Sequence, residues 1–208
     1  MKKSLLALLF AVALAVPALA ENMWVGGNLG YGSDNFSLDD YKQSSTSWSV
    51  EPEFGYSLND KWDIGLDFEY ASKAGVDSIY NISLKPMIGD STVEAKEMGI
   101  APFVRYHVAK IAGVDVMLKG SAFYAKGEIN SYGESVDYKA YGVTVAPVIS
   151  YSINETWSIG ATLDFLNISY IYAEIDDGNE WGAKPNNKHF GFNANDGSLI
   201  SIGFSYHF

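Results

Sequence analysis

The chain has 208 residues and a formal net charge of −11, from 25 Asp+Glu against 14 Lys+Arg. The acidity argues against nucleic-acid binding, which requires a basic face, and the absence of cysteine excludes disulfide frameworks, thiolate metal sites and cysteine nucleophiles. The high content of aromatic residues (14%) and of glycine (20 residues), with only 19% charged residues, favours a single all-β domain over a helical bundle.

The first twenty residues have the pattern of a secretory signal peptide. Lys2 and Lys3 precede an apolar run over residues 5–16, and a small-residue cleavage site ends at Ala20. The alternative, an uncleaved helical anchor, fits less well because the apolar run is short for a membrane span. We therefore expect a signal peptide at 1–20 and a mature domain at 21–208.

Apolar residues alternate with small or polar ones along most of the mature chain. Period-two alternation places the two sets on opposite faces of a β-strand. The last segment is the clearest, because Ile202, Phe204, Tyr206 and Phe208 alternate with small or polar residues. The pattern predicts eight strands, at 23–32, 47–58, 62–71, 98–108, 114–124, 140–153, 157–166 and 198–208.

A unit in which proline is followed four residues later by tyrosine, then by a short turn and a new strand, occurs three times, from Pro52, Pro102 and Pro147. It predicts β-hairpins with tight turns, such as those at 59–61 and 154–156. The opposite connections, at 33–46, 72–97, 125–139 and 167–197, are expected to be long loops. Because proline cannot donate to a strand ladder, each of the three should mark a bulge or a lost hydrogen bond. Their functional role is not evident from the sequence.

Two further segments complicate the strand count. Residues 78–87 resemble a strand, and part of 167–192 offers another. Bacterial single-chain membrane barrels have even numbers of strands, so 78–97 is interpreted as a hairpin beyond the membrane. Ten strands remain the alternative to eight.

Eight antiparallel strands joined by hairpins predict an up-and-down β-barrel. A soluble barrel of the lipocalin type would turn its apolar face inward, around a ligand, whereas an outer-membrane barrel would turn it toward lipid. The apolar face carries no charged residue at its central positions, whereas the other face is small or charged, as lipid contact and a crowded interior require. Aromatic residues mark the turn-side strand ends, as in an interfacial girdle: Tyr56, Trp62, Tyr106, Tyr151 and Trp157. These features favour a transmembrane barrel.

On these residues the chain resembles the small outer-membrane β-barrel family, the group of the OmpA-type transmembrane domain and OmpX. The resemblance implies that the terminal strand, with Ile202, Phe204, Tyr206 and Phe208, is the signal read by the barrel-assembly machinery. It also implies short turns and both termini in the periplasm, long loops outside the cell, and a monomer in contact with outer-membrane lipids and lipopolysaccharide. Full-length OmpA-type proteins continue into a peptidoglycan-binding domain, which does not follow Phe208, so a tethering role is not expected.

Charged residues are expected on the inner face of the barrel: Glu51, Glu53, Asp63, Asp67, Glu69, Arg105, Lys119 and Asp164. Buried charges must be paired, and an eight-stranded barrel is just wide enough for its side chains to fill. We therefore expect a paired network that plugs the lumen. A narrow conduit for small cations or solutes is the alternative, because acids exceed bases.

No catalytic motif is present, so no enzymatic function and no cofactor are expected. His107 and His207 fall near the turn-side rim, where polar packing is favoured over metal binding or proton transfer. A lipid-modifying or proteolytic barrel enzyme would depend on His189 in the longest loop. Asp176, Asp177 and Glu180 form an acidic loop, interpreted as solvated rather than as a cation site. The predicted role is structural, or interaction with an extracellular ligand through the loops.

Overall fold

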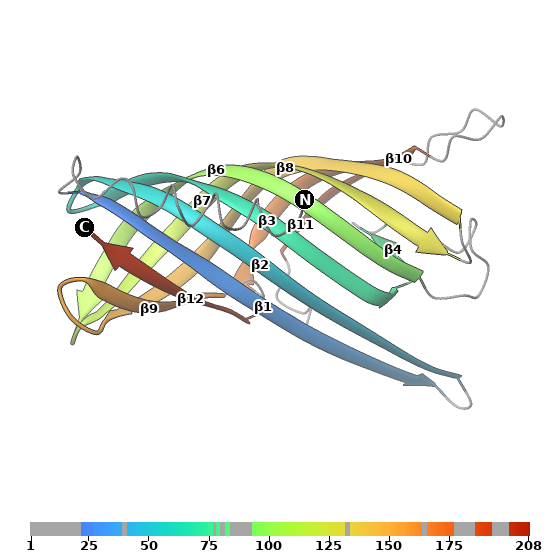
Figure 1. Cartoon of the computed structure of the whole chain (residues 1–208), viewed down its shortest axis with the longest axis horizontal. Helices are drawn as coiled ribbons and strands as arrows, with labels where there is room; N and C mark the ends of the chain where they lie inside the picture. Colours follow the sequence, from blue (N-terminus) through green and yellow to red (C-terminus); the bar gives the residue numbers. More distant parts are fainter. Residues whose placement is uncertain are drawn as a thin grey trace, which may run out of the picture.

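A computed structural model describes residues 22–38, 41–76, 78–79, 82–83, 93–131, 134–163, 166–176, 186–192 and 200–208. The predicted signal peptide at 1–20 lies outside this part of the chain. Figure 1 shows long, tilted strands running between two ends of the molecule. The end with the short connections is called the turn end, and the opposite one the loop end.

The described residues form twelve strands, and every paired neighbour is antiparallel. They do not include a helix long and apolar enough to cross a membrane. The strands are β1 (Met23–Leu38), β2 (Tyr41–Asn59), β3 (Trp62–Val76), β4 (Ser78–Ile79), β5 (Ile82–Ser83), β6 (Val93–Ile111), β7 (Val114–Ser131), β8 (Glu134–Ser152), β9 (Trp157–Leu163), β10 (Ile168–Asp176), β11 (Asn186–Phe192) and β12 (Ile200–His207).

The strands close into an eight-stranded barrel, as the sequence predicts. The ring runs β1-β2-β3-β6-β7-β8-β9-β12 and returns to β1. Strands β9 and β10 both pair with β8, one after the other along its length, so they occupy the same place in the ring. Strand β11 pairs with β10 as β12 pairs with β9, so β10 and β11 do not add strands to the ring. Strands β4 and β5 pair with each other in a separate small sheet. Eight strands, rather than ten, is therefore the arrangement found.

The chain turns tightly at one end of the barrel. Asn59 accepts a hydrogen bond from the Lys61 amide at 2.9 Å, and Asn154 accepts from two amides of its own turn. Between β6 and β7, Ala112 and Gly113 both have positive φ, of 51° and 86°, as a two-residue hairpin turn requires. The Phe208 amide donates to the Met23 carbonyl at 3.1 Å, so the first described strand and the end of the chain meet at this turn end.

The apolar face points outward. Leu29, Val143, Ile202 and Phe204 are each more than half exposed, whereas Glu53, Arg105 and Lys119 are less than a tenth exposed on the inside. This orientation is the one expected for contact with lipid, and it is the opposite of a soluble ligand-carrying barrel.

The strands extend further toward the loop end than predicted. The expected loops at 33–46, 72–97, 125–139 and 167–197 are partly strand, because β1 runs to Leu38, β6 begins at Val93 and β7 runs to Ser131. The prediction was wrong here because it followed the apolar face, which ends earlier than the backbone pairing does.

Each of the three repeat prolines interrupts the ladder on one side. Pro52 pairs with β1 but not with β3, and Pro102 pairs with β3 but not with β7, without a change of register. Pro147 pairs with β7 and lies where β8 passes from β9 to β10. There Val145 pairs with Ile168 and Val148 with Thr162. Three steps along β8 thus correspond to six steps along the chain from β9 to β10, which is a bulge of three extra residues. This confirms the expected lost hydrogen bonds and bulge.

Candidate functional site

Two pairs of like-charged residues face the interior of the barrel. Glu53 on β2 lies directly opposite Asp67 on β3, and Arg105 on β6 lies directly opposite Lys119 on β7. Like charges directly opposite on neighbouring strands destabilise a sheet. The strand order places the acidic pair next to the basic pair, so each neutralises the other.

Short ion pairs join the two sides. A carboxylate oxygen of Glu53 lies 2.6 Å from the Arg105 guanidinium, and its other oxygen lies 2.6 Å from the Lys119 ammonium. Lys119 also lies 2.6 Å from Asp67. The Asn28 side-chain amide donates to Glu53 at 3.0 Å, which extends the connection to β1. Five strands thus contribute to one electrically balanced layer.

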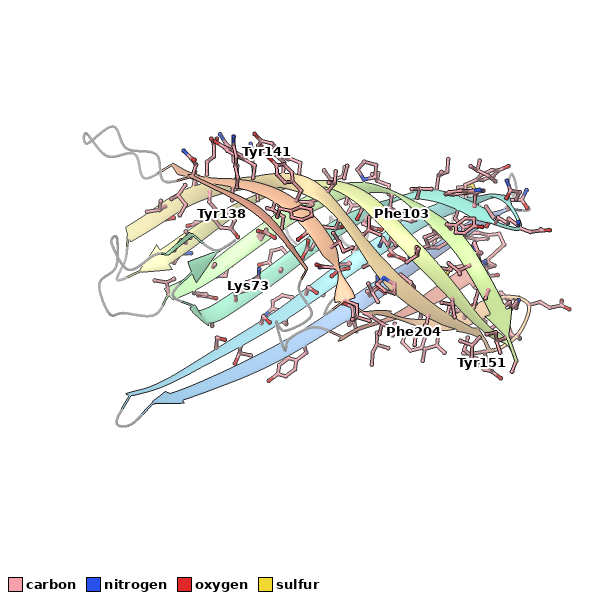
Figure 2. All side chains as sticks on the ribbon, turned by 180° about the vertical axis from the view of Figure 1, so that it is seen from behind. Lys73, Phe103, Tyr138, Tyr141, Tyr151 and Phe204 are labelled. Atoms are coloured by element: carbon pink, nitrogen blue, oxygen red, sulfur yellow. The ribbon has the colours of Figure 1, made fainter. Side chains whose placement is uncertain are left out.

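Aromatic rings fill the space beside this layer. The Arg105 guanidinium carbon lies 4.6 Å from the centre of the Trp24 ring and 4.9 Å from that of Phe103, and the Lys119 ammonium lies 4.6 Å from that of Phe103. Trp24 is 1% exposed. Phe103 is labelled among the side chains of Figure 2. Such cation–π contacts stabilise both the cations and the position of the rings.

A second polar group lies nearer the turn end. The two ring nitrogens of His107 lie 2.7 Å from Asp115 and 3.0 Å from Asp63. Carboxylates accept hydrogen bonds, so only the doubly protonated imidazolium can donate to both of them. His107 therefore acts as a cationic bridge between β3 and β7.

Toward the loop end an apolar cluster occupies part of the interior. A buried cluster there joins Val93, Ala95, Ile129, Tyr138, Ala140, Ala173 and Ile175. The Tyr138 hydroxyl, labelled in Figure 2, donates to Glu97 at 2.9 Å. The described lumen is thus filled in three layers: a histidine bridge, an ion-pair layer and an apolar cluster.

Comparison with known proteins identifies the fold. The family model described as "Outer membrane protein beta-barrel domain" matches residues 6–208. The chain belongs to this family. No curated protein sequence matches it.

Solved structures with the same architecture are outer-membrane proteins. OprG from Pseudomonas aeruginosa is 14% identical, with a TM-score of 0.51, 91% of this chain covered and 96% of the other. Neisserial surface protein A is 13% identical, with a TM-score of 0.49 and coverages of 89% and 97%. Ail of Yersinia pestis is 11% identical, with a TM-score of 0.42 and coverages of 91% and 100%. At these identities the likeness concerns the fold alone. The location follows from the family instead: as a member of the outer-membrane β-barrel family, this barrel is an integral protein of the Gram-negative outer membrane.

The structure divides the charged residues predicted from the sequence into separate groups. Glu53, Asp67, Arg105 and Lys119 come together, whereas Asp63 pairs with His107. Glu51 accepts a hydrogen bond from Ser49 at 3.0 Å, and Glu69 lies on β3 opposite Gly99. Asp164, Asp177, Glu180 and the side chains of Asp176 and His189 lie outside the described part of the chain.

The residues predicted as a girdle lie on the outer surface of this outer-membrane barrel at its turn end. Trp62 packs against Tyr106, with ring centres 4.7 Å apart, and Trp157 packs against Tyr206 at 5.0 Å. Tyr56 and Tyr151 are 42% and 50% exposed. Along the terminal strand, Tyr206 contacts Phe208 at 5.0 Å, and Ile202 and Phe204 face outward.

Sequence reasoning missed several interior residues of this barrel. Trp24 was not assigned to a face, although its parity with Gly26 and Asn28 places it inside. For His107, polar packing near the rim was predicted, but its partners Asp63 and Asp115 were not. The pair Glu97 and Tyr138 was missed because 72–97 and 125–139 were predicted to be loops. Within the described residues, no group of three or more His, Cys, Asp or Glu side chains is arranged to hold a metal ion.

Proposed function

We propose that this barrel is a non-enzymatic outer-membrane protein with a closed lumen, whose role is structural or depends on contacts made at its loop end. The observation that carries the proposal is the balanced layer of Glu53, Asp67, Arg105 and Lys119. Three ion pairs of 2.6 Å within the lumen join β2 and β3 to β6 and β7 there, beside buried aromatic rings. An ion crossing the barrel would have to break at least one of these pairs in a low-dielectric interior, which is costly.

Two belts of aromatic residues support the placement in a bilayer. On β2 the belts are marked by Tyr56 and Trp48, and on β3 by Trp62 and Tyr70, eight residues apart in each strand. Eight residues at about 3.3 Å each, tilted by about 40°, span roughly 20 Å, close to the apolar band of outer-membrane barrels. Figure 2 labels Tyr151, near the turn end of β8, and Tyr141, ten residues nearer the loop end of the same strand. In the proposed orientation the turn end is periplasmic and the loop end extracellular.

Planar-bilayer recording tests the closed lumen. The purified barrel should give no discrete current steps. The double variant Arg105→Ala/Lys119→Ala, which removes both bases and shortens both side chains, should conduct, provided that it still shows the heat-dependent gel shift of a folded barrel. Steady cation-selective steps from the unmodified protein would support a minor porin and overturn the proposal.

The outward row of the terminal strand supports recognition by the barrel-assembly machinery. On the outer face of this strand there is a continuous row of apolar and aromatic side chains: Ile202, Phe204, Tyr206 and Phe208. Phe208→Ala should lower the amount of barrel assembled in the cell but leave spontaneous folding into vesicles unchanged. Tyr151→Ala, an outward aromatic substitution on β8, serves as the control. Equal assembly of the Phe208 variant and the unmodified chain would contradict this role.

A further inference from the structure

On three consecutive strands the outward face changes from apolar to basic toward the loop end. On β6, β7 and β8 the last outward residues of the apolar face are Met98, Tyr124 and Tyr141. The next outward residue on each strand, two positions toward the loop end, is a lysine: Lys96, Lys126 and Lys139.

Along each of these strands an acidic residue follows the lysine, although across the ladders Glu128 lies opposite Lys96 and Glu174 opposite Lys139. The outward positions two residues further are Glu94, Glu128 and Asp137. On each strand the lysine is thus next to the apolar face and the acid farther out, and the three lysines form a basic row along the border of that face. This order matters because the chain as a whole is strongly acidic.

The basic row lies at the depth of lipid headgroups. Two residues along a strand tilted by about 40° correspond to roughly 5 Å of height above the aromatic belt. Aromatic belts mark the boundary between the acyl chains and the headgroups. Ammonium groups at this height face the phosphates of the adjacent leaflet.

Two of the lysines are held against each other. Lys126 lies directly opposite Lys139 in the β7–β8 ladder, so both side chains project from the same face. Such a pair is destabilising by itself. Neither ammonium group forms an ion pair with any described residue, although Glu174 lies opposite Lys139 on β10. Lys96 differs, because Glu94 lies 3.3 Å from it.

The interior contains a similar pair of opposed bases, but there an anion lies between them. Inside, the opposed bases Arg105 and Lys119 share the carboxylate of Glu53 between them. Outside, Lys126 and Lys139 have the same cross-strand relationship without a bridging anion among the described residues. The Lys126 ammonium lies 6.0 Å from the ring centre of Tyr124, which keeps it close to the aromatic belt.

We propose that Lys126 and Lys139 bind a phosphate group of the outer-leaflet glycolipid, lipopolysaccharide, between them. The phosphate supplies the anion that neutralises the opposed pair, and the lipid places it at the height of the lysine row. The assignment to the outer leaflet rests on the proposed orientation of the barrel. The binding itself depends only on the lysine pair and the neighbouring belt, and not on the closed lumen.

The test compares thermal unfolding, followed by the heat-dependent gel shift, in phosphatidylcholine vesicles with and without lipid A. Lipid A should raise the midpoint of the unmodified barrel by about 3–6 °C, the shift that a tenfold change in the folded-to-unfolded ratio gives in a domain of this size. Lys126→Gln/Lys139→Gln should lose this shift. In neutral vesicles the same variant should be at least as stable as the unmodified barrel, because the repulsion is removed.

The control is Lys61→Gln/Lys110→Gln, which removes two exposed lysines from the turn end and should keep the full shift. Vesicles carrying lipid A in both leaflets make the result independent of orientation, and the current recordings test the closed lumen separately. Inorganic phosphate added to neutral vesicles should produce no comparable shift. The proposal is overturned if lipid A does not stabilise the unmodified barrel, if the Lys126/Lys139 variant keeps the shift, if the control loses it, or if free phosphate reproduces it.

Discussion

The indole ring of Trp24 on β1 lies directly over Gly55 on β2, so a methyl group at Gly55 would overlap the ring. Trp24 is fully enclosed and also packs against His207 and Phe103, with ring centres 6.3 and 6.0 Å apart. The ring therefore cannot move without disturbing the Arg105 guanidinium on its face. The lack of a side chain at Gly55 therefore provides the space that the Trp24 ring occupies in the lumen.

Gly55→Ala should destabilise the barrel by about 1–3 kcal/mol, the usual cost of overpacking a filled core. The measurement is urea unfolding of the barrel in vesicles, followed by tryptophan fluorescence. Gly99→Ala is the matched control, because a methyl group there meets its nearest neighbours at an ordinary 3.5 Å on the same inner face. Equal midpoints for the two variants would mean that Trp24 does not need the space over Gly55.

Removing one base from the ion-pair layer should be costly. Lys119→Met leaves Asp67 without its cation and Glu53 with Arg105 only, and breaking a buried pair in this way costs about 3–5 kcal/mol. The second variant, Lys119→Met/Asp67→Asn, should recover part of the loss because it also removes the stranded charge. Unfolding midpoints in urea give both values. A double variant no more stable than the single one would show that Asp67 is not compensated by Lys119.

The sequence was sufficient to predict the barrel and which face of each strand points outward, because alternation sets the face of each residue. Leu29, Ile202 and Phe204 face outward in the structure, and Arg105 and Lys119 face inward, as their parity requires. The strand lengths were not predicted, because beyond Met98, Tyr124 and Tyr141 the outward residues become charged. There backbone pairing continues without an apolar signal.

Interior contacts depend on register, which the sequence does not specify. Asp63, His107 and Asp115 have inward parity, but they meet diagonally across the ladders, since Asp63 is paired with Arg105 and His107 with Met117. The inward position of Trp24 follows from its parity, yet tryptophan near a strand end usually indicates an interfacial girdle. Only the facing Gly55 shows where the ring fits.

Substitution of His107 should separate the two carboxylates it bridges. His107→Phe keeps a ring at this position but removes both donors, which should cost about 1–3 kcal/mol at the buried Asp63 and less at the partly exposed Asp115. His207→Phe is the control, because the Nε2 of His207 reaches only the Ser158 and Ser205 hydroxyls, at 3.5 Å. The urea midpoint should be highest for the unmodified barrel, lower for His207→Phe and lowest for His107→Phe. A reversed order would exclude the bridge as a significant contact.

The turn between β6 and β7 offers a stabilising change. Ala112 has a φ of 51°, in the left-handed region, which disfavours residues with a Cβ atom but which asparagine tolerates. Ala112→Asn should therefore raise stability by up to about 1 kcal/mol and speed refolding into vesicles if the hairpin forms early. Ala109→Asn, the same substitution at an exposed position near the turn end of β6, should not stabilise the barrel. If the two variants shift the unfolding midpoint equally, the backbone conformation at Ala112 is not the cause.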